Sequence, residues 1–266
     1  MRTRTLALTT ALLATAASLA LAHDTWLSAA SYFVRPGTEL RLELTSGMAF
    51  PALESPIRPE RVQRAELHLA GRVDTLGRGV AGERALQLRA RPQREGVARL
   101  RVSLGPRPIE LKPDEVAHYL DEIGAPDSIR RIAAAGGPFR ELYTKHALAF
   151  VRVGEPTADR SWAAPLGLPL ELVPEQDPTA LVPGDTLVLR VLSGGAPQPG
   201  FAVGAVREGA APLLLRADAG GRVRVPIGGA GRYLVRGTEL RRSSQPNVDW
   251  ESDFVTLTFA VRERAR

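Results

Sequence analysis

The chain has 266 residues, of which 44% are hydrophobic and 24% charged, a balance typical of a globular protein long enough for two domains. Its net charge of +6 comes from arginines scattered among Glu and Asp, without a basic block that interleaves aromatic residues, so nucleic acid is not an expected partner. The chain has no cysteine, which excludes disulfides, thiolate metal ligands and a cysteine nucleophile.

The first 22 residues have the pattern of a secretory signal peptide. Two arginines give a positive start, an apolar run follows over 6–21, and Ala20 and Ala22 place small residues at the cleavage positions. Cleavage after Ala22 leaves His23 as the first residue, whereas cleavage after Ala20 does not. No later apolar run approaches the ~20 residues of a membrane-spanning helix. We therefore expect a periplasmic protein with no membrane span in the mature chain.

A mature chain that begins at His23 carries two nitrogen donors on one residue, the α-amine and the imidazole. These groups titrate near roughly 8 and 6.5, so both can lose their proton close to neutral pH. Together they can close a chelate ring on a borderline metal ion such as Cu(II) or Ni(II). His23 is therefore the first candidate metal ligand. The alternative is that a histidine follows the cleavage site by chance.

Residues 23–155 are expected to form a first β-sandwich. Strict alternation of apolar and polar residues predicts half-buried strands at 40–44, 65–69, 85–89 and 98–102. The glycines and prolines fall largely between these runs, where turns need them.

A helical insertion is expected within this sandwich, over about 113–147. Pro113 and two following acidic residues open a helix that Gly124 ends. A second short helix is expected over 128–135 and a third over 139–147.

Residues 156–168 are rich in proline, alanine and small polar residues and are expected to form a linker. Residues 169–266 then carry six or seven short apolar runs of strand length, which predicts a second sandwich. A Pro-Gly pair precedes a strand in both halves, at 36–37 and at 183–184. The sequence thus predicts a mainly β fold with two tandem immunoglobulin-like or transthyretin-like sandwiches.

Four histidines remain after the signal peptide: His23, His68, His118 and His146. His146 lies at the expected junction of the third helix and the next strand, a suitable place for a metal ligand. His68 alternates with two leucines, so its side chain leaves the leucine face for solvent or a cleft. His118 lies in the first expected helix and is interpreted mainly as helix surface or packing. No two histidines have the spacing of a metal motif, so the fold has to assemble any metal site.

The chain has no nucleophile elbow of the Gly-x-Ser-x-Gly type, no phosphate-binding glycine loop and no clear pair of carboxylates for acid–base catalysis. These features favour a binding protein over an enzyme.

Five segments carry a resemblance to a known family, each to a different part of that family's sequence. They are His23-Asp24-Thr25-Trp26-Leu27, Tyr119-Leu120-Asp121-Glu122-Ile123-Gly124, Glu141-Leu142-Tyr143-Thr144-Lys145-His146-Ala147, Pro165-Leu166-Gly167-Leu168-Pro169-Leu170-Glu171-Leu172-Val173-Pro174 and Asp249-Trp250-Glu251-Ser252. Together they resemble a bacterial periplasmic family of unknown function whose members are often described as nickel- or cobalt-uptake components. The resemblance implies two β-sandwich domains and a link to transition-metal uptake. It makes His23 the leading ligand and His146 the second, because His146 falls inside a matching segment. His118 stands where the pattern usually has an aromatic residue.

The first functional hypothesis is a periplasmic metal-binding accessory protein for nickel or cobalt, with copper as the alternative ion. His23 would chelate the ion, His146 and His68 would add nitrogen ligands, and the partner would be an inner- or outer-membrane metal transporter. Because nitrogen sites bind Cu(II) most tightly, affinity alone does not identify the ion. A second hypothesis is a cell-envelope structural or interaction module that binds protein or polysaccharide. A third is a copper-dependent oxidase with an N-terminal histidine brace, which needs a second histidine close to His23.

Overall fold

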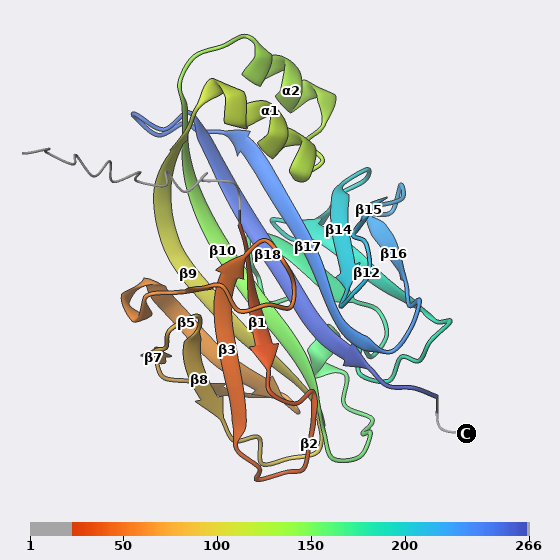
Figure 1. The fold of residues 1–266 in the computed structure, drawn as a ribbon. Coiled ribbons are helices and arrows are strands. Elements are labelled where there is room, and N and C mark those ends of the chain that lie inside the picture. Colours follow the sequence, from red (N-terminus) through yellow and green to blue (C-terminus); the bar gives the residue numbers. More distant parts are fainter. Residues whose placement is uncertain (1–22, 265–266) are drawn as a thin grey trace, which may run out of the picture.

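The computed structural model describes residues 23–264, and Figure 1 shows their fold. The expected signal peptide, residues 1–22, lies outside the described residues. The described part is mainly β, as the sequence predicts, and folds into strands β1–β18 with helices α1 and α2 and the short 3-10 helices η1 (Pro59–Arg61) and η2 (Ser161–Ala163). No helix in this part is long and apolar enough to cross a membrane.

A large central sheet runs through the whole molecule (Figure 1). Its strands lie in the order β15 (Leu213–Arg216), β14 (Ala202–Arg207), β17 (Gly231–Arg242), β18 (Trp250–Val261), β10 (Phe139–Val153), β9 (Gly96–Leu111), β5 (Val62–Leu69) and β6 (Arg72–Thr75), and β2 (Phe33–Val34) pairs with the end of β10. The neighbours pair antiparallel except for β10, which is parallel to β18 and β2.

Two smaller sheets cover the central sheet. The first outer sheet contains β1 (Asp24–Ala29), β3 (Leu40–Gly47), β4 (Ser55–Pro56), β7 (Val80–Ala81) and β8 (Leu86–Ala90). The second outer sheet contains β11 (Leu170–Pro174), β12 (Thr186–Ser193), β13 (Ala196–Pro197) and β16 (Arg222–Pro226).

The outer sheets pack on opposite faces of the central sheet. Successive side chains of a strand point to opposite faces. Along β10, Ala147 and Ala149 belong to the apolar core under the first outer sheet, whereas Leu148 and Phe150 belong to the core under the second. The two expected sandwiches are therefore present, and they share the central sheet.

The expected linker packs against both sandwiches instead of spanning a gap. It contains η2, whose Trp162 is buried, and Arg99 of β9 donates a hydrogen bond to the Trp162 backbone oxygen at 3.0 Å. The domain bounds at 23–155 and 169–266 stay a prediction.

The expected helical region 113–147 is helical only in its first part. Helices α1 (Pro113–Glu122) and α2 (Asp127–Ala134) form there, but the third expected helix, over 139–147, is wrong because these residues begin β10. Two charged residues, Glu141 and Lys145, lie on the buried face of this strand and hide its two-residue period. Glu141 is accommodated there by hydrogen bonds from the hydroxyls of Tyr119 and Ser252.

Helices α1 and α2 lie beyond the first outer sheet, at one end of the long strands (Figure 1). Tyr119 and Leu120 of α1 join a small apolar core with Phe139 and Trp250, whose rings stack at 5.1 Å. This packing fixes α1 over the same face of the central sheet that the first outer sheet covers.

Candidate functional site

The first described residue, His23, is held against the central sheet. Its backbone oxygen accepts a hydrogen bond from Nζ of Lys145 at 2.5 Å, and strand β1 begins at the next residue, Asp24. Further along β1, the Thr256 hydroxyl donates to the Thr25 backbone oxygen at 2.6 Å. The beginning of β1 is thus tied to two central strands, β10 and β18.

Lys145 is a buried lysine, with 8% of its surface exposed. Its ammonium lies 5.2 Å from the ring centre of Tyr143 and 5.1 Å from that of Phe254. Burial lowers the pKa of Lys145 to about 8, although the nearby Asp24 carboxylate favours the charged form. A buried ammonium needs acceptors, and the His23 carbonyl supplies one, so Lys145 positions the residue that precedes β1.

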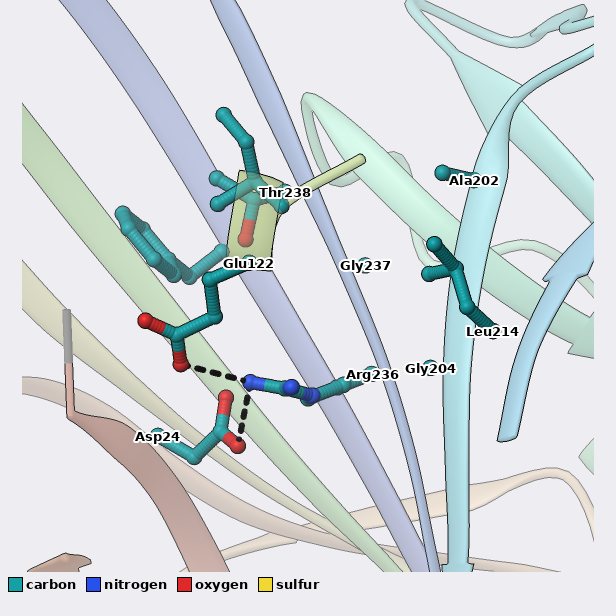
Figure 2. A pocket seen from close by; sticks show the side chains of 10 residues that line it. Asp24, Glu122, Ala202, Gly204, Leu214, Arg236, Gly237 and Thr238 are labelled. Carbon is teal, nitrogen blue, oxygen red and sulfur yellow. Dashed lines mark hydrogen bonds and ion pairs between the residues drawn. The ribbon is translucent and has the colours of Figure 1, made fainter. Parts of the chain in front are cut away.

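An arginine joins two carboxylates beside β1, as Figure 2 shows. Nη1 of Arg236 lies 2.9 Å from Oδ2 of Asp24 and 3.0 Å from Oε1 of Glu122, which ends α1. Burial raises the pKa of Asp24, and the charges of Arg236 and Lys145 oppose that rise. The second carboxylate oxygen of Glu122 is buried and has no hydrogen-bond partner.

An open pocket of about 400 Å³ lies next to this ion pair. Strands β14 and β17 form one side of it, the segment 47–50 after β3 forms another, and α1 contributes His118 and Glu122. Asp24 and Arg236 also line it. The pocket therefore opens beside the residue that follows His23.

The structure places His118 on the wall of this pocket, a position that the sequence did not predict. It is exposed on α1, as expected of a helix surface, and it also lines the pocket. The signal in the sequence is its spacing to Glu122, because residues four apart lie on one face of a helix. Lys145 and Arg236 are the residues of this candidate site that sequence reasoning missed, since nothing local connects β10 or β17 with β1.

His146 lies on the other face of β10 from Lys145. Its Nδ1 is 2.9 Å from Oγ of Ser103, and its Nε2 is buried without a partner. Because Ser103 Oγ already accepts a hydrogen bond from Nε of Arg101, at 2.9 Å, the serine proton is free to donate to Nδ1. Burial lowers the pKa of His146 to about 4, so the imidazole is neutral at neutral pH.

His68 belongs to the same polar cluster as His146. Its Nε2 is 3.0 Å from Oε2 of Glu66, which lies 3.6 Å from Arg101 Nη1. Arg101 in turn contacts Ser103, the partner of His146. The structure thus connects His68 and His146 through three intervening side chains across β5, β9 and β10.

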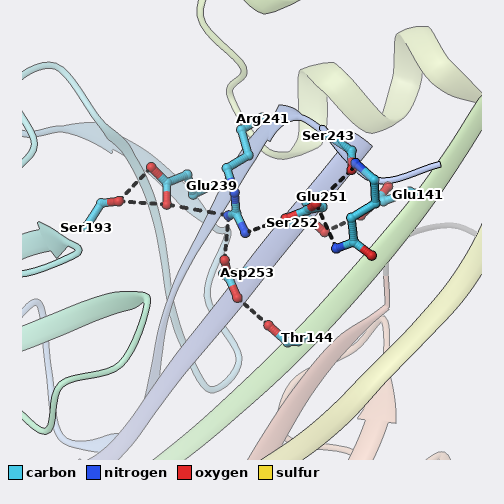
Figure 3. Close-up of polar contacts among 10 residues, drawn as sticks. Glu141, Thr144, Ser193, Glu239, Arg241, Ser243, Glu251, Ser252 and Asp253 are labelled. Atoms are coloured by element: carbon cyan, nitrogen blue, oxygen red, sulfur yellow. Dashed lines mark hydrogen bonds and ion pairs between the residues drawn. The ribbon is translucent and has the colours of Figure 1, made fainter. Parts of the chain in front are cut away.

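Polar contacts continue across β17 and β18 on this face of the sheet (Figure 3). Asp253, almost fully buried, accepts hydrogen bonds from the Thr144 hydroxyl and from Arg241 Nη1, the latter at 2.6 Å. Glu239 accepts one from Ser193 of the second outer sheet at 2.8 Å. These contacts supply hydrogen-bond donors to the carboxylates of Asp253 and Glu239.

The three histidines expected to share one metal ion are therefore not brought together. His23 contacts Lys145 on one face of β10, whereas His146 and His68 lie on the other face, because neighbouring residues of a strand point in opposite directions. Within residues 23–264, no three His, Asp or Glu side chains form a cluster that could hold a metal ion.

The residues at the pocket fit a borderline metal ion better than a hard one. His118 on the pocket wall offers one imidazole nitrogen, and the expected cleavage after Ala22 would give the neighbouring His23 two nitrogen donors. Arg236 engages one oxygen of the Asp24 carboxylate and one of the Glu122 carboxylate. Imidazole and amine nitrogens suit nickel, cobalt and copper, whereas Mg²⁺ and Ca²⁺ require oxygen ligands.

A family model described as a domain of unknown function, DUF4198, matches residues 20–238. No curated protein matches the chain. Among solved structures, the chain is similar to fibronectin(III)-like modules of Clostridium thermocellum CbhA, at 9% identity over 89% of this chain and 94% of that one. It is also similar to three N-terminal domains of the bacteriophage RB49 outer capsid protein Hoc, at 10% identity over 91% and 71%. Both have a TM-score of 0.19, which is too low to carry an inference about this chain.

Proposed function

The chain belongs to the DUF4198 family, and we propose that it is an exported transition-metal-binding accessory protein whose cargo is nickel or cobalt, with copper as the alternative. One observation carries this proposal: a buried lysine holds the backbone of His23, and the next residue, Asp24, lines an open pocket. His23 is the residue that cleavage after Ala22 leaves first.

In the proposed site, His23 binds the ion through its α-amine and imidazole. Lys145 holds only the His23 carbonyl oxygen, so both nitrogen donors stay free for a metal ion. A terminus that is already ordered loses less conformational freedom on binding than a frayed one, which favours affinity. His118 is the additional nitrogen ligand that the pocket wall offers.

The partner proposed for this function is a membrane metal transporter. The support for it is the resemblance to a family described as nickel- or cobalt-uptake components. Since nitrogen ligands favour Cu(II) over Ni(II) and Co(II), the identity of the cargo depends on which ion the partner receives as well as on affinity.

The test is a titration of Ni(II), Co(II) and Cu(II) into protein whose first residue is shown by mass spectrometry to be His23. The matched control carries one additional alanine ahead of His23, which converts the His23 α-amine into a peptide amide and moves the free amine onto the alanine. We expect tight one-to-one binding that the additional alanine weakens. Equal binding by both proteins, or none by either, would contradict the proposed site.

A second variant, His118→Ala, separates the alternatives. His118 is exposed, so its loss should leave the fold unchanged while it weakens binding of the ion. If neither change alters metal binding, the pocket is better explained by the cell-envelope module that binds protein or polysaccharide. Copper-dependent oxidation of a polysaccharide that is lost in His118→Ala would instead favour the histidine-brace oxidase.

A further inference from the structure

A second open pocket, of about 310 Å³, lies on the outer side of the second outer sheet. Three arginines line it, and each comes from a different segment: Arg160 from the region before η2, Arg190 from β12 and Arg222 from β16. Arg190 and Arg222 are direct partners in the pairing of β12 with β16, so their side chains leave the same face side by side. The pairing register of β12 and β16 thus places the two positive charges next to each other.

One residue, Glu175, contacts all three arginines, two through its carboxylate and one through its backbone oxygen. Oε1 of Glu175 lies 2.9 Å from Nε of Arg222 and 3.7 Å from Nε of Arg190. Arg160 donates to the backbone oxygen of Glu175 at 2.9 Å. A guanidinium has five N–H donors, so most donors in the pocket remain available to a ligand.

The surrounding charges do not neutralise the pocket. Arg224, two residues after Arg222 on the same face of β16, adds a further positive charge. The Asp218 carboxylate at the preceding turn accepts hydrogen bonds from the backbone amides of Gly220 and Arg222, both at 2.9 Å. The Asp218 carboxylate therefore accepts hydrogen bonds from the backbone of its own turn and not from the arginine side chains of the pocket.

The pocket also has a fixed and partly apolar wall. The Arg160 guanidinium lies 5.4 Å from the ring centre of the buried Trp162, and Ala163 and Pro174 complete the lining. A guanidinium that stacks on an aromatic ring is held in place, which reduces the entropy lost when it binds an anion.

We propose that this pocket binds the phosphate group of a small phosphorylated ligand. Arg190 and Arg222 donate to the phosphate oxygens from one side and Arg160 from the other, while Ala163 and Pro174 contact the attached organic group. Glu175 occupies the place of the anion when the ligand is absent. A phosphate monoester fits better than a carboxylate because it offers three terminal oxygens and about two negative charges to three guanidiniums.

This inference does not depend on the metal proposal, because the two pockets share no residue. The experiment is calorimetry on the mature protein with glucose 6-phosphate as the probe, and with glucose and inorganic phosphate as comparison ligands. We expect glucose 6-phosphate to bind and glucose not to bind. Equal binding of inorganic phosphate would support the phosphate site and identify free phosphate as sufficient.

The proposal predicts opposite changes in the affinity for glucose 6-phosphate in two variants. Arg222→Gln should weaken binding of glucose 6-phosphate about tenfold, the usual effect of losing a charge-assisted hydrogen bond. Glu175→Gln should tighten binding several-fold, because it removes the competing carboxylate and keeps the side-chain shape. A merely structural role of Glu175 would not produce tighter binding.

The matched control is Arg41→Gln, which removes an exposed arginine of the first outer sheet. Thermal unfolding of each variant verifies that the fold is intact. The proposal is overturned if glucose 6-phosphate does not bind at millimolar concentration. It is also overturned if Arg41→Gln weakens binding as much as Arg222→Gln, because the effect would then be one of total charge.

Discussion

Two neighbouring residues of β10, Lys145 and His146, lie on opposite faces of the same sheet. Both are buried, but the Lys145 side chain carries a charge and the His146 side chain is neutral. The Lys145 ammonium lies between aromatic rings and donates to the His23 carbonyl oxygen. The His146 imidazole is neutral, with one nitrogen beside Ser103 and the other unpartnered. The comparison shows that one strand can support a charge on one side and exclude it on the other.

Both residues have a pKa lowered chiefly by burial, so their linkage to stability has the same sign. The unfolded chain holds a proton that the folded chain lacks between the lowered and the ordinary pKa, and stability therefore falls as pH falls through that range. For Lys145 the range runs from pH 10.5 down to about 8, and for His146 from pH 6.5 down to about 4. The protonation of Lys145 and that of His146 thus lower the free energy of unfolding of the protein in two separate pH ranges.

The largest effect is expected from Lys145→Met, which tests the face that carries the charge. It removes the donor to His23 and leaves the buried Asp24 with Arg236 alone. The loss of this charge-assisted hydrogen bond should lower the free energy of unfolding by about 3 kcal/mol at pH 7, as measured in urea. The matched control is Lys112→Met, which changes the exposed and only other lysine and should have almost no effect. Equal stability of the two variants would contradict the role assigned to Lys145.

The next effect is expected from His146→Gln, which tests the neutral face. Between pH 7 and pH 4.5, wild-type protein should lose about 2 kcal/mol more stability than the variant, because only wild type has an imidazole that gains its proton on unfolding. Urea unfolding at both pH values measures this difference. Parallel losses in the two proteins would show that His146 does not titrate as a buried group.

The smallest effect is expected from Ser103→Ala, which removes the hydroxyl between Arg101 and His146. The loss of these contacts should cost about 1 kcal/mol. Ser28→Ala is the matched control, because Ser28 is equally buried, at 4% exposed, but its hydroxyl has no hydrogen-bond partner. If both variants unfold at the same temperature as wild type, the polar cluster around His146 contributes nothing measurable.

Much of the fold could be predicted from alternation in the sequence. The strands expected at 40–44, 65–69, 85–89 and 98–102 correspond to β3, β5, β8 and β9, each with one apolar face. The beginning of β10 could not be predicted in this way, because Glu141 and Lys145 lie at buried positions. Their burial depends on hydroxyls and a carbonyl from distant segments, which no local pattern reveals.

The candidate site could be predicted only in part. The cleavage pattern identifies His23, but Lys145, which contacts His23, and Arg236, which contacts Asp24, come from β10 and β17, more than a hundred residues away in sequence. The sequence also grouped His146 with His23, and only the side-chain direction along β10 separates them. Such relations require the register of the central sheet, which composition and periodicity do not determine.

The position of β18 in the central sheet has a consequence for how the chain is completed during synthesis. Residues 250–261 are the last strand to leave the ribosome, yet they lie between β17 and β10 and pair with both. Until they arrive, each half of the sheet ends in an open edge, and β1 lacks the hydroxyls that hold it. Strand β1 therefore reaches its final position only after residues 250–261 have been made.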